Sequence, residues 1–226
     1  MIVLALTGSI AMGKSRAAAA FRASGVPVFD ADAAVHALMA PGGMAIREVA
    51  AAFPGSLGTE GGIDRQQLGR TVLGDTLALR RLEAILHPKV RAAEGGFLRR
   101  CCRAGERLAL LDIPLLFETH GEGRVDAVVV VSAHPLLQHQ RALRRPGMTD
   151  EKLAQIRAKQ LPDPAKRRRA DYLVPSGYDR GLLIAAVHDI ILHTRTLEPR
   201  AWPARWLGLA GVAERHAAPA PAAAAA

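Results

Sequence analysis

The chain has 226 residues, half of them hydrophobic, and a formal net charge of +9. This composition suits a single α/β domain with insertions and excludes an intrinsically disordered chain. No apolar run approaches the roughly 20 residues that cross a bilayer, and the N-terminus lacks a signal-peptide pattern. We therefore expect a cytoplasmic enzyme without a membrane partner. The two cysteines, Cys101 and Cys102, are too few for a metal quartet, and neighbouring cysteines rarely form a disulfide.

The positive charge is concentrated in one segment. Residues 141–169 contain ten Lys and Arg but three Asp and Glu. A nucleic-acid-binding surface would carry a longer basic stripe. The concentration therefore favours a local clamp on a polyanionic ligand, and we expect no nucleic acid as partner. The chain also contains no asparagine, which excludes the Asn-Lys-x-Asp motif by which GTPases read guanine.

The first predicted element is a phosphate-binding loop. Residues 2–6 form an apolar strand, and the loop after it ends in Gly13, Lys14 and Ser15, before a helix-prone run over residues 16–22. This is the G-x-x-x-x-G-K-[ST] pattern between a strand and a helix. Glycines let backbone N–H groups turn toward phosphate, and the helix N-terminus adds donors. Lys14 can reach the β and γ phosphates and Ser15 can ligate Mg²⁺, so the pattern predicts a nucleoside triphosphate without naming the acceptor.

Three carboxylates follow the ends of two further predicted strands, where open α/β sheets bind ligands. Asp30 and Asp32 come after a short buried strand over residues 26–29. Asp112 closes an apolar strand over residues 108–111 in the manner of a Walker B motif, which delivers a carboxylate toward Mg²⁺. Asp30 can equally cap the next helix. Asp32 either faces the γ-phosphate or complements the helix dipole.

The segment between these two strands is mostly helical by periodicity. Pro88 should interrupt the last of its helices at His87, because proline disfavours helix at the preceding residue. A helical insertion after the second strand is common where a kinase holds its acceptor, which suggests that role for residues 33–107. The predicted helices cover residues 34–39, 46–53, 64–72, 75–87 and 90–102.

The second half of the chain supplies two more strands and the basic segment. Residues 127–131 are a β-branched run without alternation, typical of a strand buried on both faces. Residues 172–174 form the last strand. The basic residues over about 141–169 are either a solvated face or a lid that brings cations to the γ-phosphate.

The C-terminal stretch changes in composition. From residue 198 onward it is rich in Pro and Ala, which predicts a disordered tail. Trp202 and Trp206 are candidates to dock on the body. We therefore expect a domain over residues 1–197 and a tail over residues 198–226.

In their order, these motifs resemble the dephospho-coenzyme A kinase family over about residues 1–195. The resemblance implies an α/β P-loop kinase fold: a three-layer sandwich with a five-stranded parallel sheet, a helical acceptor-binding insertion and a helical lid. It also implies transfer of the ATP γ-phosphate to the ribose 3′-hydroxyl of 3′-dephospho-coenzyme A, the last step of coenzyme A biosynthesis. Besides the phosphate-binding loop, the matching stretches are residues 27–32, 63–68, 86–88, 112–118 and 170–172, which read PVFDAD, IDRQQL, LHP, DIPLLFE and ADY.

The resemblance implies roles for single residues. Asp32 would orient or deprotonate the 3′-hydroxyl, while Lys14 and Arg141 would act on the transferring phosphate. His87 would lie in the acceptor-binding region, beside the active centre.

The same resemblance implies the partners. We expect ATP as co-substrate with Mg²⁺, dephospho-coenzyme A as acceptor, and a monomer. Ser15 and Asp112 are the expected Mg²⁺ ligands. The expected ATP-binding residues are Gly8, Ala11, Met12, Gly13, Lys14, Ser15 and Arg16.

The loop departs from the family's usual G-G-I-G-S-G-K-S-T. Ser9, Ala11, Met12 and Arg16 stand where the family has glycine, glycine, serine and threonine. Ala11 and Met12 add side chains to a loop that often needs positive φ, which non-glycine residues resist. Residues 175–177, Pro-Ser-Gly, replace the family's Asn-Gly, so the contacts to adenine are left open.

Two other functions stay open. One is another small-molecule P-loop kinase, such as a nucleoside or nucleotide kinase. The other is a P-loop ATPase that binds nucleic acid through the basic segment, which predicts stimulation by DNA or RNA and steeply salt-dependent binding. The stretches over residues 30–32 and 112–118 favour the dephospho-coenzyme A kinase over the other kinases.

Overall fold

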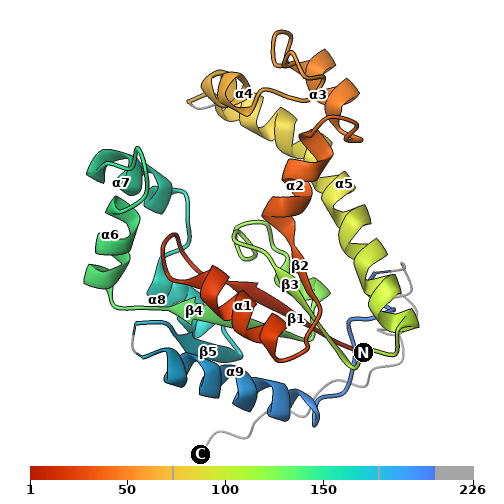
Figure 1. Cartoon of the computed structure of the whole chain (residues 1–226), viewed down its shortest axis with the longest axis vertical. Helices are drawn as coiled ribbons and strands as arrows, with labels where there is room; N and C mark the ends of the chain where they lie inside the picture. The colour runs from red at the N-terminus through yellow and green to blue at the C-terminus, as the bar shows by residue number, and fades with distance from the viewer. Residues whose placement is uncertain (73, 178, 207–226) are drawn as a thin grey trace, which may run out of the picture.

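The computed structural model describes residues 1–72, 74–177 and 179–206. Within these residues, five strands form one parallel sheet in the order β2-β3-β1-β4-β5 (Figure 1), which confirms the predicted fold class. The strands are β1 (Ile2–Thr7), β2 (Val28–Asp30), β3 (Leu108–Asp112), β4 (Ala127–Ser132) and β5 (Tyr172–Pro175). The helices are α1 (Lys14–Ala23), α2 (Ala31–Met39), α3 (Ile46–Ala52), α4 (Arg65–Val72), α5 (Thr76–Arg103), α6 (Pro135–Leu143), α7 (Asp150–Ala158), α8 (Asp163–Arg168) and α9 (Arg180–Thr194), with a 3₁₀ turn at Glu122–Arg124.

The register of the sheet brings the strand ends level. Leu6 of β1 and Asp30 of β2 both pair with Asp112 of β3. β1 is buried along its whole length, and most of β3 and β4 is buried too, as expected for parallel strands covered on both faces. The loop after β1 and the carboxylates after β2 and β3 therefore meet at one edge.

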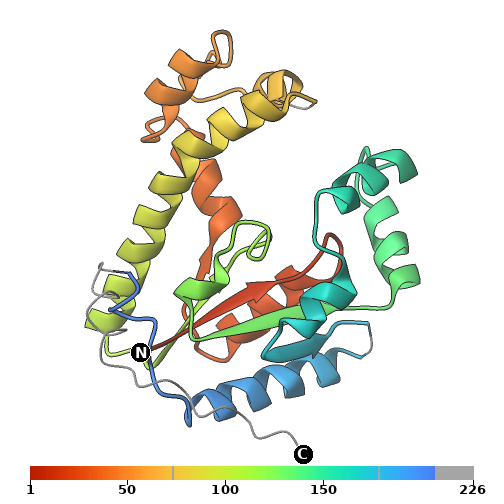
Figure 2. The same ribbon diagram turned by 180° about the vertical axis from the view of Figure 1, so that it is seen from behind.

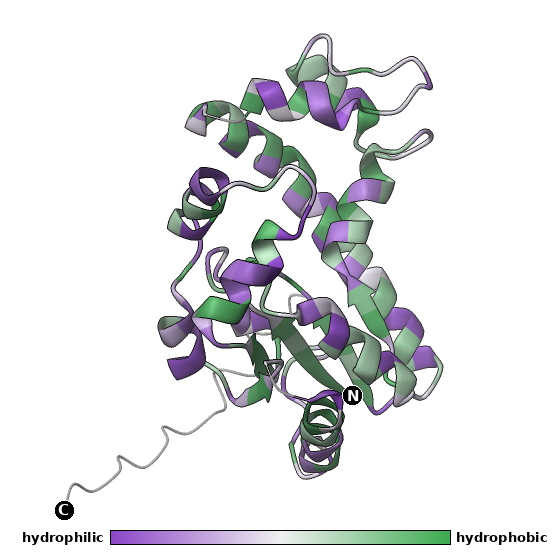
Figure 3. Ribbon diagram, turned by 60° about the vertical axis from the view of Figure 1, so that its left-hand side comes forward, coloured by the Kyte–Doolittle hydropathy of each residue, from purple (hydrophilic) through white to green (hydrophobic). Residues whose placement is uncertain are grey.

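Helices cover both faces of the sheet and complete the three-layer sandwich. On one face, Phe21 of α1 and Val187 of α9 are fully buried against the strands. On the other face lie the C-terminal half of α5, the loop after β3 and α8 (Figure 2). Figure 3 shows the strands as a mainly hydrophobic layer among helices of mixed hydropathy. In the described ranges, no helix is both long and apolar enough to cross a membrane.

Two helical arms stand on opposite sides of the strand carboxyl ends (Figure 1). The first arm consists of α2, α3, α4 and the N-terminal half of α5, and it has its own core around Leu38 and Leu68. The second arm consists of α6 and α7. Apart from the first two residues of α2, the first arm falls within the segment expected to bind the acceptor, residues 33–107, and the second arm overlaps the expected lid, residues 141–169.

Helix α5 runs without a break through Pro88, so the predicted interruption at His87 is wrong. Its N-terminal half packs into the first arm through Leu82 and Leu86, and its C-terminal half packs on the sheet through Leu98. A proline inside a helix costs about 3 kcal/mol, because it removes one backbone hydrogen bond and crowds the preceding turn. Packing on both sides of the proline outweighs this local cost.

The described part of the C-terminal stretch is folded against the body. Ala201 and Trp202 are buried in the cluster on the α5 face of the sheet, and Trp206 packs beside them. The expected docking of both tryptophans is therefore confirmed. The prediction of disorder is wrong for residues 198–206, because it rested on amino-acid composition alone, which does not show that Ala201 and Trp202 are buried. The rest of the predicted tail, residues 207–226, lies outside the described residues.

One carboxylate joins the two ends of the described chain. Asp126 Oδ2 accepts a hydrogen bond from the Val3 N–H of β1 at 2.7 Å. Asp126 Oδ1 accepts hydrogen bonds from the N–H groups of Arg200 at 2.6 Å and Ala201 at 2.8 Å. The C-terminal stretch is thereby tied to the middle of the sheet.

Candidate active site

The P-loop between β1 and α1 depends on two glycines. Gly13 adopts φ +88°, and a Cβ there would lie 2.7 Å from the Ser176 hydroxyl oxygen. A Cβ at Gly8 would lie 2.7 Å from the Val131 carbonyl oxygen of β4. Neither position has room for a side chain, and glycine is also the residue that adopts the left-handed backbone without strain. The loop therefore turns tightly over the end of β1, as its sequence pattern predicts.

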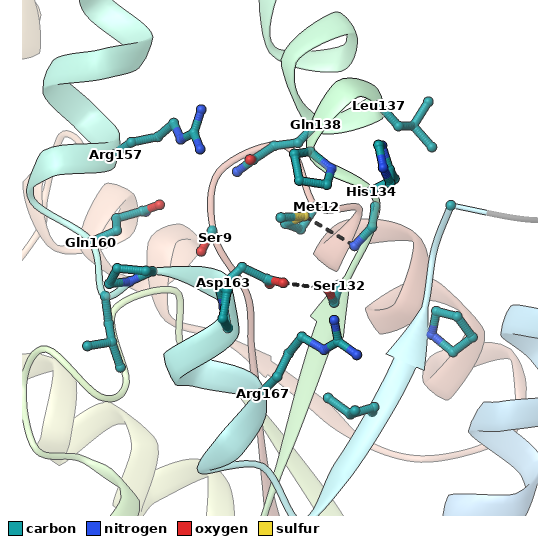
Figure 4. Close-up of a pocket in the computed structure, with 18 of the residues that line it drawn as sticks. Ser9, Met12, Ser132, His134, Leu137, Gln138, Arg157, Gln160, Asp163 and Arg167 are labelled. Atoms are coloured by element: carbon teal, nitrogen blue, oxygen red, sulfur yellow. Dashed lines mark hydrogen bonds between the residues drawn. The ribbon is translucent and has the colours of Figure 1, made fainter.

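Ala11 and Met12, two of the four residues that depart from the family pattern, are buried. Ala11 adopts φ 60°, which costs a residue with a Cβ about 1–2 kcal/mol, and it packs against Ala142 of α6. Met12 is 2 % exposed, and its sulfur accepts a hydrogen bond from the Ala133 N–H at 3.2 Å (Figure 4). The expected positive φ is therefore present at Ala11, in spite of its Cβ.

Lys14 and Asp112 form a largely buried ion pair beside the P-loop. Lys14 Nζ lies 2.6 Å from Asp112 Oδ1, and the Asp112 side chain is 4 % exposed. Burial raises the pKa of the Asp112 carboxyl, and the Lys14 cation opposes this shift. The carboxylates of Asp30 and Asp32 raise the same pKa further. The four charged groups therefore share one electrostatic site at the edge of the sheet.

Asp30 and Asp32 differ in their bonding. Asp30 Oδ1 accepts a hydrogen bond from the Ala33 N–H at 2.9 Å and caps α2, which confirms the capping interpretation. Asp32 lies in the first turn of α2, is exposed, and takes no part in the cap. Of the two carboxylates, Asp32 is therefore the one that the helix cap does not use.

Arg141 extends from α6 toward the P-loop. Its guanidinium donates hydrogen bonds to the Ser176 hydroxyl at 3.1 Å and to the Ser176 carbonyl at 2.7 Å. Arg141 Nη1 would lie 3.5 Å from a Cβ on Gly13. Burial lowers the pKa of Arg141, and the nearby Arg16 cation lowers it further. Two cations thus stand at the end of the P-loop, where an anion would offset their mutual repulsion.

Ser15 and Arg16 are exposed in the first turn of α1, next to the lysine of the loop.

His87 stands apart from these groups. His87 is exposed in the middle of α5. Among the described residues, no hydrogen bond or ion pair joins it to the P-loop or to the carboxylate cluster.

Sequence reasoning missed three polar side chains that bind the P-loop backbone. Ser176 Oγ donates a hydrogen bond to the Met12 carbonyl. Gln138 donates its amide N–H to the Ile10 carbonyl at 2.9 Å, and Gln160 accepts a hydrogen bond from the Ile10 N–H at 2.9 Å. They lie 128 to 164 residues away from their partners in the chain, so no local pattern indicates them. The one available signal was the Pro-Ser-Gly that replaces the family's Asn-Gly.

A cavity of about 1240 Å³ opens on the outer side of the P-loop (Figure 4). It lies between the loop, the second arm, α8 and the ends of β4 and β5. Apolar groups such as Leu137 and Leu173 form part of its wall. Its polar wall residues include Ser9, Gln138, Arg157, Gln160, Asp163 and Arg167.

Lys166 does not behave as a member of a basic surface. Its side chain is fully buried, and its Nζ lies 2.8 Å from Glu118 Oε1. The same Glu118 oxygen accepts a hydrogen bond from the Leu161 N–H at 2.7 Å. Lys166 therefore belongs neither to a solvated face nor to a phosphate-facing lid, because its charge serves to join α8 to the loop after β3.

Known proteins share the sequence and the fold. Residues 2–178 match the family model described as dephospho-CoA kinase. A dephospho-CoA kinase from Mesorhizobium japonicum is 56 % identical over 191 residues, which cover 84 % of this chain and 95 % of that protein. A dephospho-CoA kinase from Paramagnetospirillum magneticum is 61 % identical over 167 residues, which cover 74 % and 78 % of the two chains.

Solved structures agree with this match. A crystal structure from Thermus thermophilus has a TM-score of 0.76 at 31 % identity and covers 87 % of this chain and 98 % of its own. A dephospho-CoA kinase from Campylobacter jejuni has a TM-score of 0.57 at 22 % identity, covers 85 % and 96 %, and supports the fold alone. On the family model and the identity to its relatives, this chain belongs to the dephospho-CoA kinase family.

Proposed function

We propose that this protein transfers the γ-phosphate of ATP to the ribose 3′-hydroxyl of 3′-dephospho-coenzyme A, which yields coenzyme A and ADP in the last step of coenzyme A biosynthesis. One observation of the geometry carries the proposal. Lys14, Asp112 and Asp32 share one electrostatic site at the strand edge from which both arms rise. Family membership supplies the identity of the acceptor.

The P-loop and the start of α1 would hold the ATP phosphates. Lys14 lies within reach of that place, and a polyphosphate would compete with Asp112 for its ammonium group. The N-terminus of α1 has no side-chain cap, so its unpaired N–H groups suit phosphate oxygens. The residues proposed to bind ATP are Gly8, Ala11, Met12, Gly13, Lys14, Ser15 and Arg16.

Ser15 and Asp112 would hold Mg²⁺. Mg²⁺ prefers oxygen ligands, and in kinases it uses one or two protein groups with phosphate oxygens and water. The donor set fits this habit, because Ser15 offers a hydroxyl oxygen and Asp112 a carboxylate oxygen, which leaves the other ligand positions to phosphate and water. When bound, the ion neutralises negative charge on the phosphates.

Asp32 and Arg141 would act on the two sides of the transfer. Asp32 holds the 3′-hydroxyl and takes its proton as the oxygen bonds to the γ-phosphorus and the bond to the ADP oxygen breaks. Arg141 stabilises the charge on the transferring group. We assign acceptor binding to the part of residues 33–107 that forms the first arm, with His87 as a contact, and the lid to the part of residues 141–169 that lies in the second arm.

An ADP-release assay with a panel of acceptors tests the proposal. The panel holds dephospho-coenzyme A, AMP, adenosine, shikimate and gluconate, with single-stranded DNA and RNA as further additions. We expect turnover with dephospho-coenzyme A to exceed the others by at least about 100-fold, because a site built for a substrate's polar groups rejects analogues that lack them. Higher turnover with another acceptor, or ADP release stimulated by nucleic acid, would overturn the assignment.

A further inference from the structure

Both ends of the second arm bind the same residue of the P-loop. Gln138, at the base of α6, donates its amide N–H to the Ile10 carbonyl at 2.9 Å. Gln160, just after α7, accepts a hydrogen bond from the Ile10 N–H at 2.9 Å. Figure 4 shows the two amides reaching the loop from the segments that lead into and out of this arm. The arm therefore touches the loop on both sides of a single residue.

Chemistry determines how the two amides are oriented. A backbone carbonyl only accepts and a backbone N–H only donates, so Gln138 must present its NH₂ group and Gln160 its oxygen. Gln138 is 3 % exposed, and a buried amide that lost its partner would pay the cost of an unsatisfied polar group. The contact of Gln138 thus needs a hydrogen-bond donor at the end of the side chain, whereas the contact of Gln160 needs an acceptor.

The residue next to Ile10 explains why such a clamp is needed. Ala11 is held at φ 60°, and a non-glycine residue stays in this region when its surroundings over-determine it. Ala11 also packs with Ala142 of α6 and Leu153 of α7. Hydrogen bonds and apolar contacts from the same arm therefore converge on two consecutive residues of the loop.

We propose that Gln138 and Gln160 are positioning residues, which keep the P-loop in its phosphate-binding shape and make its tip part of the second arm. The inference rests on the proposed function, because the shape in question is the one that receives ATP. Neither glutamine touches the reacting atoms; each acts through the Ile10 backbone.

The same substitution at the two positions tests the clamp. Gln138→Glu removes the NH₂ donor and sets a carboxylate oxygen against the Ile10 carbonyl. Gln160→Glu keeps the oxygen that the Ile10 N–H needs. Both variants are nearly isosteric and add the same charge beside the loop, so each is the control for the other. The readouts are kcat and the KM values for ATP and for dephospho-coenzyme A, with the melting temperature.

We expect Gln138→Glu to raise the KM for ATP by about tenfold or more, since it leaves a buried polar group unpaired. Gln160→Glu keeps the acceptor for the Ile10 N–H, so it should raise this KM at least about threefold less than Gln138→Glu does, and the KM for dephospho-coenzyme A should change less than about twofold in both. The proposal would be overturned if the two variants had equal KM values for ATP, whether or not these values exceeded that of the parent enzyme. A parallel rise in both KM values with a large fall in melting temperature, which marks a merely structural role, would also overturn it.

A second background tests the link to Ala11. Glycine reaches φ 60° without strain. In the Ala11→Gly variant, the loop therefore has little strain to release when the hydrogen bond from residue 138 is lost. We expect Gln138→Glu to raise the KM for ATP about fivefold less in the Ala11→Gly background than in the parent. An equal effect in both backgrounds would refute the role in holding Ala11. Failure of the proposed function is a separate result, because then the parent enzyme itself would not phosphorylate dephospho-coenzyme A.

Discussion

Lys14 forms an ion pair with the buried carboxylate of Asp112, and we propose that it also binds the phosphates of ATP. We expect Lys14→Ala to lower turnover by about 100- to 1000-fold, because it removes a preorganised charge from the phosphate site. ADP release at saturating ATP and dephospho-coenzyme A measures the effect. Near-parent turnover by a folded Lys14→Ala protein would refute the P-loop assignment.

The same variant should show a pH-dependent loss of stability. The pKa of Asp112 is raised by burial in the folded protein, so the folded state binds that proton more tightly than the unfolded state. Such a group lowers the free energy of unfolding as pH rises through its folded pKa. Removing Lys14 raises this pKa further, so Lys14→Ala should lose more stability at pH 8 than at pH 5. Urea titrations at both pH values measure it, and equal losses would contradict the expectation.

The two carboxylates around the start of α2 should respond differently to amidation. Asp32→Asn loses a base and a charge, and we expect kcat with dephospho-coenzyme A to fall by about 100-fold or more with little change in ATP affinity. Asp30→Asn should do less, because asparagine is also a good helix cap. Turnover and ATP binding of both variants separate the roles. An active Asp32→Asn enzyme beside an inactive Asp30→Asn enzyme would move the catalytic role to Asp30.

Arg141 should not tolerate replacement by lysine. Its guanidinium bonds two oxygens of Ser176 beside the P-loop, and lysine keeps the charge but loses the planar fork. We expect Arg141→Lys and Arg141→Ala both to lower kcat at saturating substrates, by about 10- to 1000-fold. If the KM for ATP alone changes, Arg141 is a binding residue, and the catalytic cation must be sought among Arg144, Arg145 and Arg157.

At this scale, what the sequence predicts depends on distance along the chain. Lys14 was predictable from a local motif, and Asp32 and Asp112 from their place after strands that end at one edge. Gln138 and Gln160 were not, because each meets Ile10 across more than 120 residues. Only the fold brings such partners together.

At the scale of elements, the buried Lys166–Glu118 pair joins α8 to the loop after β3. Lys166→Met leaves a charged carboxylate in the interior, and we expect it to lower the free energy of unfolding by about 3–5 kcal/mol. Glu118→Gln in the same chain removes that charge and keeps an acceptor for the Leu161 N–H. The double variant should therefore be more stable than Lys166→Met alone. Urea titration of the three proteins tests this, and strictly additive losses would show that the two groups do not interact.

Two errors about elements have the same cause. Pro88 and the Pro- and Ala-rich composition after residue 198 are local signals of broken helix and disorder. Leu82 and Leu98 hold α5 on both sides of the proline, and Trp202 fills a place in the core beside the sheet. Tertiary burial overrode local preference in both cases, whereas helix starts such as those at Asp30 and Asp75 were predictable because a cap is a local interaction.

At the scale of the whole molecule, composition and pattern predict an α/β domain, and the three-layer sandwich was what the family resemblance implied; buried parallel strands need helices on both faces. The register that sets Asp30 level with Asp112 did not follow from the sequence. Nor did the placement of the arms on opposite sides of the strand ends (Figure 1). Both depend on packing between segments that are far apart in the chain.

The order of strands also governs how the newly made chain behaves. β1 is the middle strand of the sheet and precedes its other strands in the chain, yet its Ile2 pairs with Leu108 of β3 and its Leu4 with Ala127 of β4. At about 5–20 residues per second, β1 waits roughly 5 to 25 seconds for both partners to be synthesised. The apolar side chains of β1, buried in the folded protein, lack these partners in the meantime. We therefore expect this chain to be prone to aggregation while it is still being translated, before its phosphate site exists.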